Sequence, residues 1–202
     1  MKENFKLGAI LLIITSIAGL LLGFANDLTK EAILENSKLN KEDLKVIMPQ
    51  AESIEDSGIA GNEAVTEIFK AKNGNEEVGY VFKVTTKGFH GPVDLVVAIS
   101  NEDVITGMKV MAHSETPGLG AKIVEEEFRT RFNNLPTTED ITMVKTAPAK
   151  DSEVSAITGA TVSSNAIGTA VTDALRFYKE NIKGEEVAPK EESDATTAAS
   201  SW

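Results

Sequence analysis

The hydroxyl-rich stretch 158–164, Thr-Gly-Ala-Thr-Val-Ser-Ser, contains the residues of this chain whose types and spacing best suit chemistry. A glycine and an alanine separate its two threonines, so the backbone there has little side-chain cover. The stretch precedes a segment with helical spacing, and the free N–H groups and positive dipole at the start of a helix attract phosphate. One of the hydroxyls could also be esterified. Hydroxyl-rich turns are common as plain helix caps too, so on this stretch alone an ordinary cap is the alternative.

The segment after this stretch predicts a long helix with one apolar face. Ser163 or Ser164 is expected as its N-cap, and Gly184 as the residue just past its C-terminus. The hydroxyl-rich stretch is therefore expected at the N-terminus of a helix that packs on the core. The predicted apolar stripe consists of Ile167, Ala170, Val171, Ala174, Leu175, Tyr178 and Ile182.

A second candidate stretch is 115–122, Glu-Thr-Pro-Gly-Leu-Gly-Ala-Lys. It is not a P-loop, because Gly118 and Gly120 are too close together and Lys122 is not followed by Ser or Thr. It is not a dinucleotide-binding fingerprint either, since that motif needs three spaced glycines that open a helix in a βαβ unit. A flat ring can still approach the bare backbone of its glycines, with Leu119 as an apolar contact.

The alternation of apolar and polar residues predicts an antiparallel sheet before this second stretch. The runs 78–84, 93–99 and 104–112 are joined by short turns, and 64–72 is expected as another strand. Because helices follow the strands and do not alternate with them, the predicted fold class is α+β, an antiparallel sheet with flanking helices. We further predict a loop over 52–63, a short helix over 123–132 and a strand over 142–146.

The composition limits the chemistry that the chain can perform. It has no cysteine, which excludes disulfides, thiolate metal sites and iron–sulfur clusters held by this chain. Its only histidines, His90 and His113, argue against a metal site. A net charge of -11 argues against nucleic acid as a partner. Redox chemistry would therefore require an organic cofactor.

Residues 7–25 form an almost wholly apolar run of the length that crosses a bilayer. Lys2 and Lys6 precede this run, so the positive-inside tendency places the N-terminus in the cytoplasm and the rest of the chain outside. A cleaved signal peptide is the alternative, although the run exceeds the usual length of its apolar region. The predicted order is a cytoplasmic N-terminus (1–6), a transmembrane anchor (7–25), a helical stalk and loop (26–63), the functional domain (64–183) and a disordered tail (184–202).

Together, the two stretches resemble the FMN-binding domain found in two kinds of membrane redox complex. The strings Glu115-Thr116-Pro117-Gly118-Leu119-Gly120 and Thr158-Gly159-Ala160-Thr161-x-Ser163 are similar to those of the G subunit of Rnf-type ion-translocating ferredoxin:NAD+ oxidoreductases. They are also similar to those of the C subunit of the Na+-translocating NADH:quinone oxidoreductases. The intact first string and the short chain favour the Rnf-type family, and the resemblance extends from the apolar run to about Lys183.

The resemblance implies an electron-transfer flavoprotein subunit that does not catalyse the overall reaction alone. Its expected partners are the other subunits of a complex in the cell membrane and a separate flavin transferase. The transferase would attach FMN through a phosphoester to Thr161. The family usually has an acidic residue three positions before Thr158, where this chain has Ser155, so a noncovalently held FMN is the alternative. The alternative functions are a stand-alone extracytoplasmic FMN-dependent carrier and a cofactor-free anchored binding module.

The resemblance also implies which residues surround the flavin. Around the phosphate we expect Thr158, Gly159, Ala160 and Ser163 beside Thr161. Along the isoalloxazine ring we expect Glu115, Thr116, Gly118 and Leu119.

Overall fold

The structure is a computed structural model that describes residues 6, 8, 10–24 and 39–187. The chain divides into two units, Met1–Asp43 and Leu44–Trp202. In the first unit residues 10–24 are helical, and their large apolar side chains are exposed. Among the described residues, no helix combines the length and the apolar character needed to cross a membrane. Residues 25–38 of the predicted stalk and residues 188–202 of the predicted tail lie outside the described residues.

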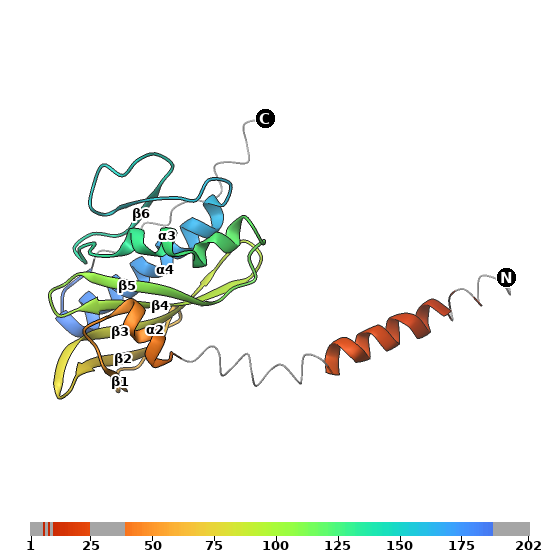
Figure 1. Cartoon of the computed structure of the whole chain (residues 1–202), viewed down its shortest axis with the longest axis horizontal. Coiled ribbons are helices and arrows are strands. Elements are labelled where there is room, and N and C mark those ends of the chain that lie inside the picture. The colour runs from red at the N-terminus through yellow and green to blue at the C-terminus, as the bar shows by residue number, and fades with distance from the viewer. Residues whose placement is uncertain (1–5, 7, 9, 25–38, 188–202) are drawn as a thin grey trace. The chain divides into compact units, whose positions relative to one another are not determined.

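The second unit is built on an antiparallel sheet in which each strand pairs with the next one along the chain (Figure 1). The alternating pattern of the sequence sets the pairing of the two central strands, with Phe82 opposite Val97 and Val84 opposite Leu95. The predicted antiparallel meander and the α+β class are confirmed. The strands are β1 (Ser53–Asp56), β2 (Val65–Asn73), β3 (Glu76–Lys87), β4 (Pro92–Ser100) and β5 (Ile105–Ala112).

Helix α4 (Thr161–Tyr178) covers one face of this sheet and packs mainly on β3. The predicted stripe from Ile167 to Tyr178 is buried, and burial of a large aliphatic side chain such as Ile167 or Leu175 contributes about 1.5–3 kcal/mol. The ring of Phe82 in β3 packs in a T-shaped arrangement with those of Phe177 and Tyr178, with centroid separations of 6.0 and 6.2 Å. A π-helical turn, Lys179–Lys183, follows and ends at Gly184, which has a φ of 69° and is the predicted terminating residue.

The other face of the sheet is covered near β5 by the C-terminal part of α2 (Lys41–Ile47). The hydroxyl of Thr106 donates to the carbonyl of Ile47 at 2.6 Å. A Cβ at Gly107 would lie 2.8 Å from the Cα of Ile47, so the absence of a side chain permits this close approach. Because α4 covers one face of the sheet and α2 the other, β4 is buried without interruption from Leu95 to Ser100.

Three local predictions are wrong in part. Residues 52–63 were predicted as a loop but contain β1. The only half-buried residue of this strand is Ile54, so its sequence shows no alternation of apolar residues. The predicted helix over 123–132 is divided because Glu125 has extended backbone with a ψ of 143°. It consists of two 3₁₀ turns, Gly120–Val124 and Thr130–Phe132, on either side of α3 (Glu126–Arg129). The predicted strand over 142–146 is the shorter β6 (Thr142–Val144), which pairs in parallel with an unpredicted strand, β7 (Glu153–Ser155).

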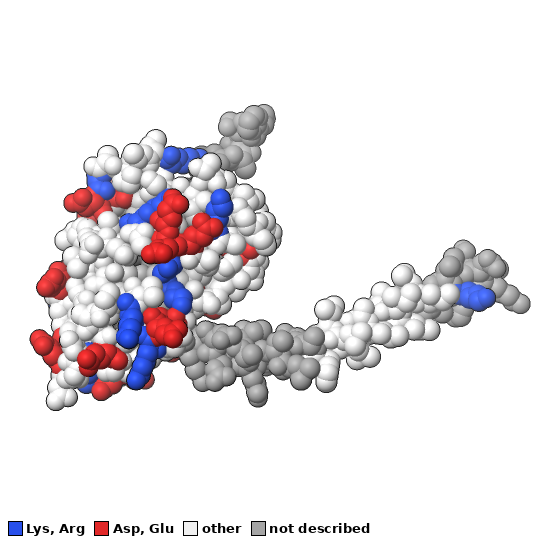
Figure 2. Space-filling view, viewed as in Figure 1, with Lys and Arg blue, Asp and Glu red and all other residues white. Residues whose placement is uncertain are grey.

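Charges of both signs are interspersed on the face of the second unit seen in Figure 2. Cross-strand ion pairs link β1 to β2 and β2 to β3, for example Lys72 with Glu55 at 2.6 Å and Lys83 with Glu67 at 2.8 Å. Exposed pairs of this kind contribute little to stability.

Candidate functional site

The two stretches singled out in the sequence meet at the N-terminus of α4 and enclose a pocket of about 430 Å³. Three segments form its walls: the β3–β4 turn (88–91), the loop after β5 (115–120) and the start of α4 with the two residues before it (159–163). Seven of the nine predicted site residues line it, all except Thr158 and Gly118. The complete lining is Phe89, Glu115, Thr116, Leu119, Gly120, Gly159, Ala160, Thr161, Val162 and Ser163.

The two remaining predicted residues lie outside this pocket. Thr158 is exposed and lines a neighbouring polar hollow together with Lys122 and Arg131. Gly118 is exposed and has a φ of 76°, and a Cβ there would meet no atom within 4 Å. The left-handed backbone of the turn explains why position 118 is a glycine.

Helix α4 begins at Thr161, two residues before the predicted serine caps. Ala160 occupies the N-cap position, and no side chain caps the helix. The hydroxyl of Ser163 donates to Glu115, and that of Ser164 accepts the N–H of Ile157 at 2.9 Å. The predicted serine cap is therefore wrong, because both hydroxyls are engaged in other hydrogen bonds.

The uncapped start of α4 leaves backbone donors open at the pocket. Among the described residues, no hydrogen bond is made by the N–H groups of Thr161, Val162 or Ser163. The first N–H groups of a helix have no partner within it, and together with the helix dipole they form a ready site for an anion. The half-buried hydroxyl of Thr161 stands at this same helix end.

Glu115 places a carboxylate in the wall of the pocket, where the residue is 4% exposed. Its Oε1 accepts the N–H groups of Phe89 and His90 at 2.7 and 3.2 Å, and its Oε2 accepts the hydroxyl of Ser163 at 2.5 Å. Burial by itself would raise the pKa of Glu115. The hydrogen bonds from Ser163, His90 and Phe89 outweigh burial, so the pKa lies below its ordinary value and the carboxylate is ionised at neutral pH.

The sequence analysis missed two apolar residues of the pocket, Phe89 and Val162. They are 63% and 53% exposed, and Leu119, which lines the same pocket, is 50% exposed. The available signal was an aromatic residue in the turn between two predicted strands, Phe89 in the stretch 88–92. Both histidines make hydrogen bonds within the protein: Nδ1 of His113 accepts the N–H of Glu115 at 3.1 Å, and Nδ1 of His90 lies 3.1 Å from the hydroxyl of Thr116.

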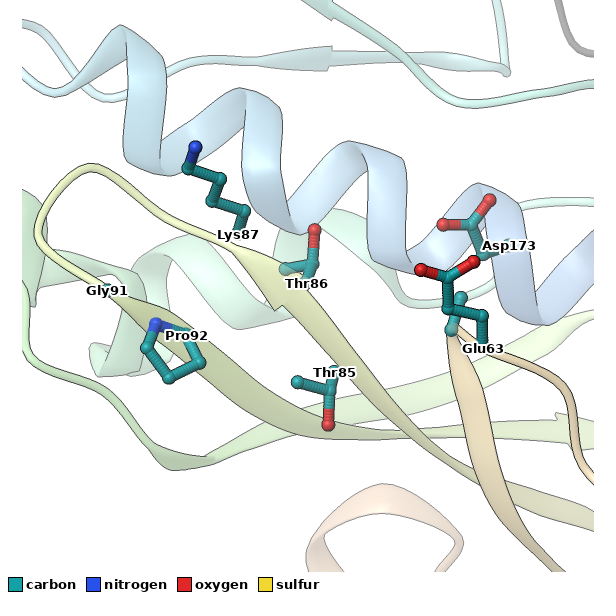
Figure 3. Close-up of a pocket in the computed structure, with 8 residues that line it drawn as sticks. Glu63, Thr85, Thr86, Lys87, Gly91, Pro92 and Asp173 are labelled. Carbon is teal, nitrogen blue, oxygen red and sulfur yellow. The ribbon is translucent and has the colours of Figure 1, made fainter.

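A larger hollow of about 630 Å³ lies on the other side of the β3–β4 turn, between α4 and the ends of β2, β3 and β4. Figure 3 shows Glu63 and Asp173 at one end and Lys87 at the other, with the hydroxyl of Thr86 directed toward the helix. This hollow contains no predicted site residue and no helix N-terminus. Within the described part of the chain, no group of three acidic or histidine side chains is placed to hold a metal ion.

The smaller pocket has the features of a site for a phosphorylated ring. Its volume is in the usual range for small-molecule sites, which combine apolar walls with a few directed polar groups. Phe89, Leu119 and Val162 supply the apolar walls, and the first turn of α4 supplies the anion donors. The residues present therefore fit an FMN, with its phosphate at the helix and its ring toward the exposed apolar side chains.

Both stretches fall within a single known domain family, since residues 88–176 match the FMN-binding domain. The chain is 32% identical over 193 residues to the G subunit of the Na+-translocating ferredoxin:NAD+ oxidoreductase complex of Acetobacterium woodii, covering 88% of this chain and 93% of that protein. It is 34% identical over 183 residues to the G subunit of the ion-translocating oxidoreductase complex of Methanosarcina acetivorans, covering 87% and 95%. Among solved structures, the C subunit of the Na+-translocating NADH-quinone reductase of Parabacteroides distasonis aligns with a TM-score of 0.49 at 24% identity, covering 55% of this chain and 59% of that one.

Proposed function

Because this chain belongs to the G-subunit family of ion-translocating ferredoxin:NAD+ oxidoreductase complexes, we propose that it relays electrons through an FMN seated in the pocket at the start of α4. It is an electron-transfer flavoprotein subunit of a redox-driven ion translocase, and the overall reaction requires the other subunits. The observation that carries the proposed site is the uncapped N-terminus of α4, where Thr161 and three open N–H groups meet the pocket.

The proposed attachment is a phosphoester between FMN and the hydroxyl of Thr161, formed by a separate flavin transferase. The remaining negative charge of such a diester would lie at the positive end of α4, where the open N–H groups of the first turn can bind it. Gly159 and Ala160 leave space for the phosphate, since a Cβ at Gly159 would meet only Leu119, at 3.6 Å. Ser163 would contribute its N–H group, because its hydroxyl is bonded to Glu115.

The proposed ring site is the part of the pocket that is lined by Phe89, Thr116, Leu119 and Val162. When bound, FMN supplies the reversible uptake and release of electrons, chemistry that no side chain of this protein can perform. The role of the protein is to hold the ring by its phosphate and to exclude water from it with apolar side chains. The residues that line the pocket would fill both roles.

We also propose that residues 7–25 anchor the protein in the cell membrane, with the N-terminus in the cytoplasm and the flavin domain (64–183) outside. The support is the uncharged apolar run of the sequence, the exposed apolar side chains of residues 10–24, and the basic residues Lys2 and Lys6 before them. An anchor of this kind would keep the flavin near the membrane subunits that exchange electrons with it.

Replacing Thr161 by valine tests the attachment. The full chain is expressed together with a flavin transferase, and the membrane fraction is examined for flavin fluorescence on a denaturing gel and by intact mass. The wild type should fluoresce and carry the mass of one FMN minus water, whereas Thr161→Val should be dark. Thr169→Val, the same change at an exposed position of α4 outside the pocket, is the matched control and should fluoresce. Covalent flavin on Thr161→Val would overturn the assignment, and an unmodified, colourless wild type would overturn the function.

A further inference from the structure

We propose that Glu115 is the positioning residue of the flavin pocket, whose carboxylate holds the three wall segments in the arrangement that receives the ring. The inference rests on the proposed function, because it concerns the same pocket. It differs from the expectation that Glu115 lines the ring as a contact residue.

One carboxylate connects all three segments. Its Oε1 takes two backbone N–H groups from the β3–β4 turn, those of Phe89 and His90, and its Oε2 takes the hydroxyl of Ser163 in the first turn of α4. The backbone of Glu115 itself is fixed by the bond from its N–H to His113. The wall residues Phe89 and Leu119 and the attachment residue Thr161 therefore keep their relative positions through a single side chain.

Two glycines provide the space for this carboxylate, one beside each oxygen. A Cβ at Gly88 would lie 2.3 Å from Oε1, and a Cβ at Gly120 would lie 2.5 Å from Oε2 and 2.6 Å from the hydroxyl of Ser163. Neither glycine has the left-handed backbone that would by itself explain its identity, in contrast to Gly118 in the same loop. Room for the carboxylate explains the absence of a side chain at both positions.

Both carboxylate oxygens are bonded to donors of the protein, and the residue is almost completely buried. Glu115 therefore acts on the shape of the pocket and does not reach toward the ligand. Because the three donors favour the charged form, a neutral amide of the same size is a weaker substitute. Its oxygen can still accept the N–H groups of the turn, but without the charge, and its NH₂ group would have to donate to the hydroxyl of Ser163, which reverses that hydrogen bond.

The test compares Glu115→Gln, which keeps the size and removes the charge, with Ser163→Ala, which removes only the bond to α4. Ser163→Thr keeps a hydroxyl and serves as the rescue variant. Glu125→Gln, at an exposed glutamate of the same region, is the matched control. Each full-length chain is flavinylated by the transferase, and access to the ring is measured from quenching of flavin fluorescence by iodide and from visible circular dichroism.

Glu115→Gln and Ser163→Ala should increase iodide quenching and change the dichroism of the bound flavin. Ser163→Thr should change both signals less than Ser163→Ala does, and Glu125→Gln should match the wild type. The inference is overturned if Glu115→Gln and Ser163→Ala leave both signals unchanged. A second measurement needs no flavin: in the unflavinylated chain, Glu115→Gln should speed amide exchange at Phe89 and His90 by about tenfold. Unchanged exchange at these amides would also overturn it. Failure of the proposed function would appear separately, as a wild type without flavin.

Discussion

Replacing Gly120 by alanine is expected to destabilise the folded protein by about 2–6 kcal/mol, through the carboxylate of Glu115. The added Cβ would lie 2.5 Å from Oε2 of Glu115 and 2.6 Å from the hydroxyl of Ser163. The loop cannot easily retreat, because the N–H of Ala121 is bonded to the carbonyl of Thr116 at 3.0 Å. The carboxylate must therefore move, and the buried hydroxyl loses its acceptor. Leaving a buried polar group unpaired costs about 1–3 kcal/mol, and overpacking a buried position costs about as much again.

The assay is urea unfolding of the unflavinylated full-length chain in detergent, followed by far-ultraviolet circular dichroism. Gly118→Ala is the control, because a Cβ there meets no atom within 4 Å and only the φ of 76° opposes it. That conformation costs a non-glycine residue about 1–2 kcal/mol. If Gly120→Ala is as stable as Gly118→Ala, the reasoning is refuted. The carboxylate of Glu115 could then move away from the added Cβ at no cost in stability.

Three other perturbations test hydrogen bonds that hold the domain together. Folding lowers the pKa of Glu115 from its ordinary value of 4.5, in spite of burial. The ionised carboxylate therefore stabilises the folded protein above that pH, and this stabilisation is lost as the pH falls below it. In urea unfolding, the free-energy difference between wild type and Glu115→Gln should accordingly narrow below pH 4.5. Tyr178→Phe removes a hydroxyl that donates to Asp103 at 2.7 Å and should lower the free energy of unfolding by about 1–3 kcal/mol. Thr172→Val keeps the side-chain shape but removes the acceptor of the buried N–H of Ile141, 3.0 Å away, which should cost about 1–3 kcal/mol and speed exchange of that amide.

The parts of the fold that follow from local periodicity could be predicted from the sequence. Alternation along 78–84 and 93–99 identified β3 and β4, because each strand presents its apolar residues to α4 with a period of two. The stripe from Ile167 to Tyr178 identified the buried face of α4 for the corresponding reason. The two stretches that form the pocket were also recognisable, since glycines and hydroxyls gather where a chain must leave backbone accessible.

What the sequence could not provide depends on contacts between distant segments. Strand β1 is short and mostly exposed, so its sequence has no apolar alternation. It is a strand because it pairs with β2. The serine cap failed for the same reason, because Ser163 bonds to Glu115, which lies 48 residues away. Phe89 joins the pocket only because the β3–β4 turn folds back onto Glu115, 26 residues further along the chain.

The start of α4 departs from what would make this helix most stable. A serine, threonine or aspartate cap is worth about 0.5–2 kcal/mol over alanine, yet Ala160 holds the cap position while two serines nearby bond elsewhere. Three large apolar side chains, Phe89, Leu119 and Val162, are exposed around the same helix end. Departures from local rules gather at functional sites, where something outside the chain compensates for them. A phosphate at the open N–H groups and a flat ring against the apolar side chains would compensate for both departures at once, which is why we place the flavin at this end of α4.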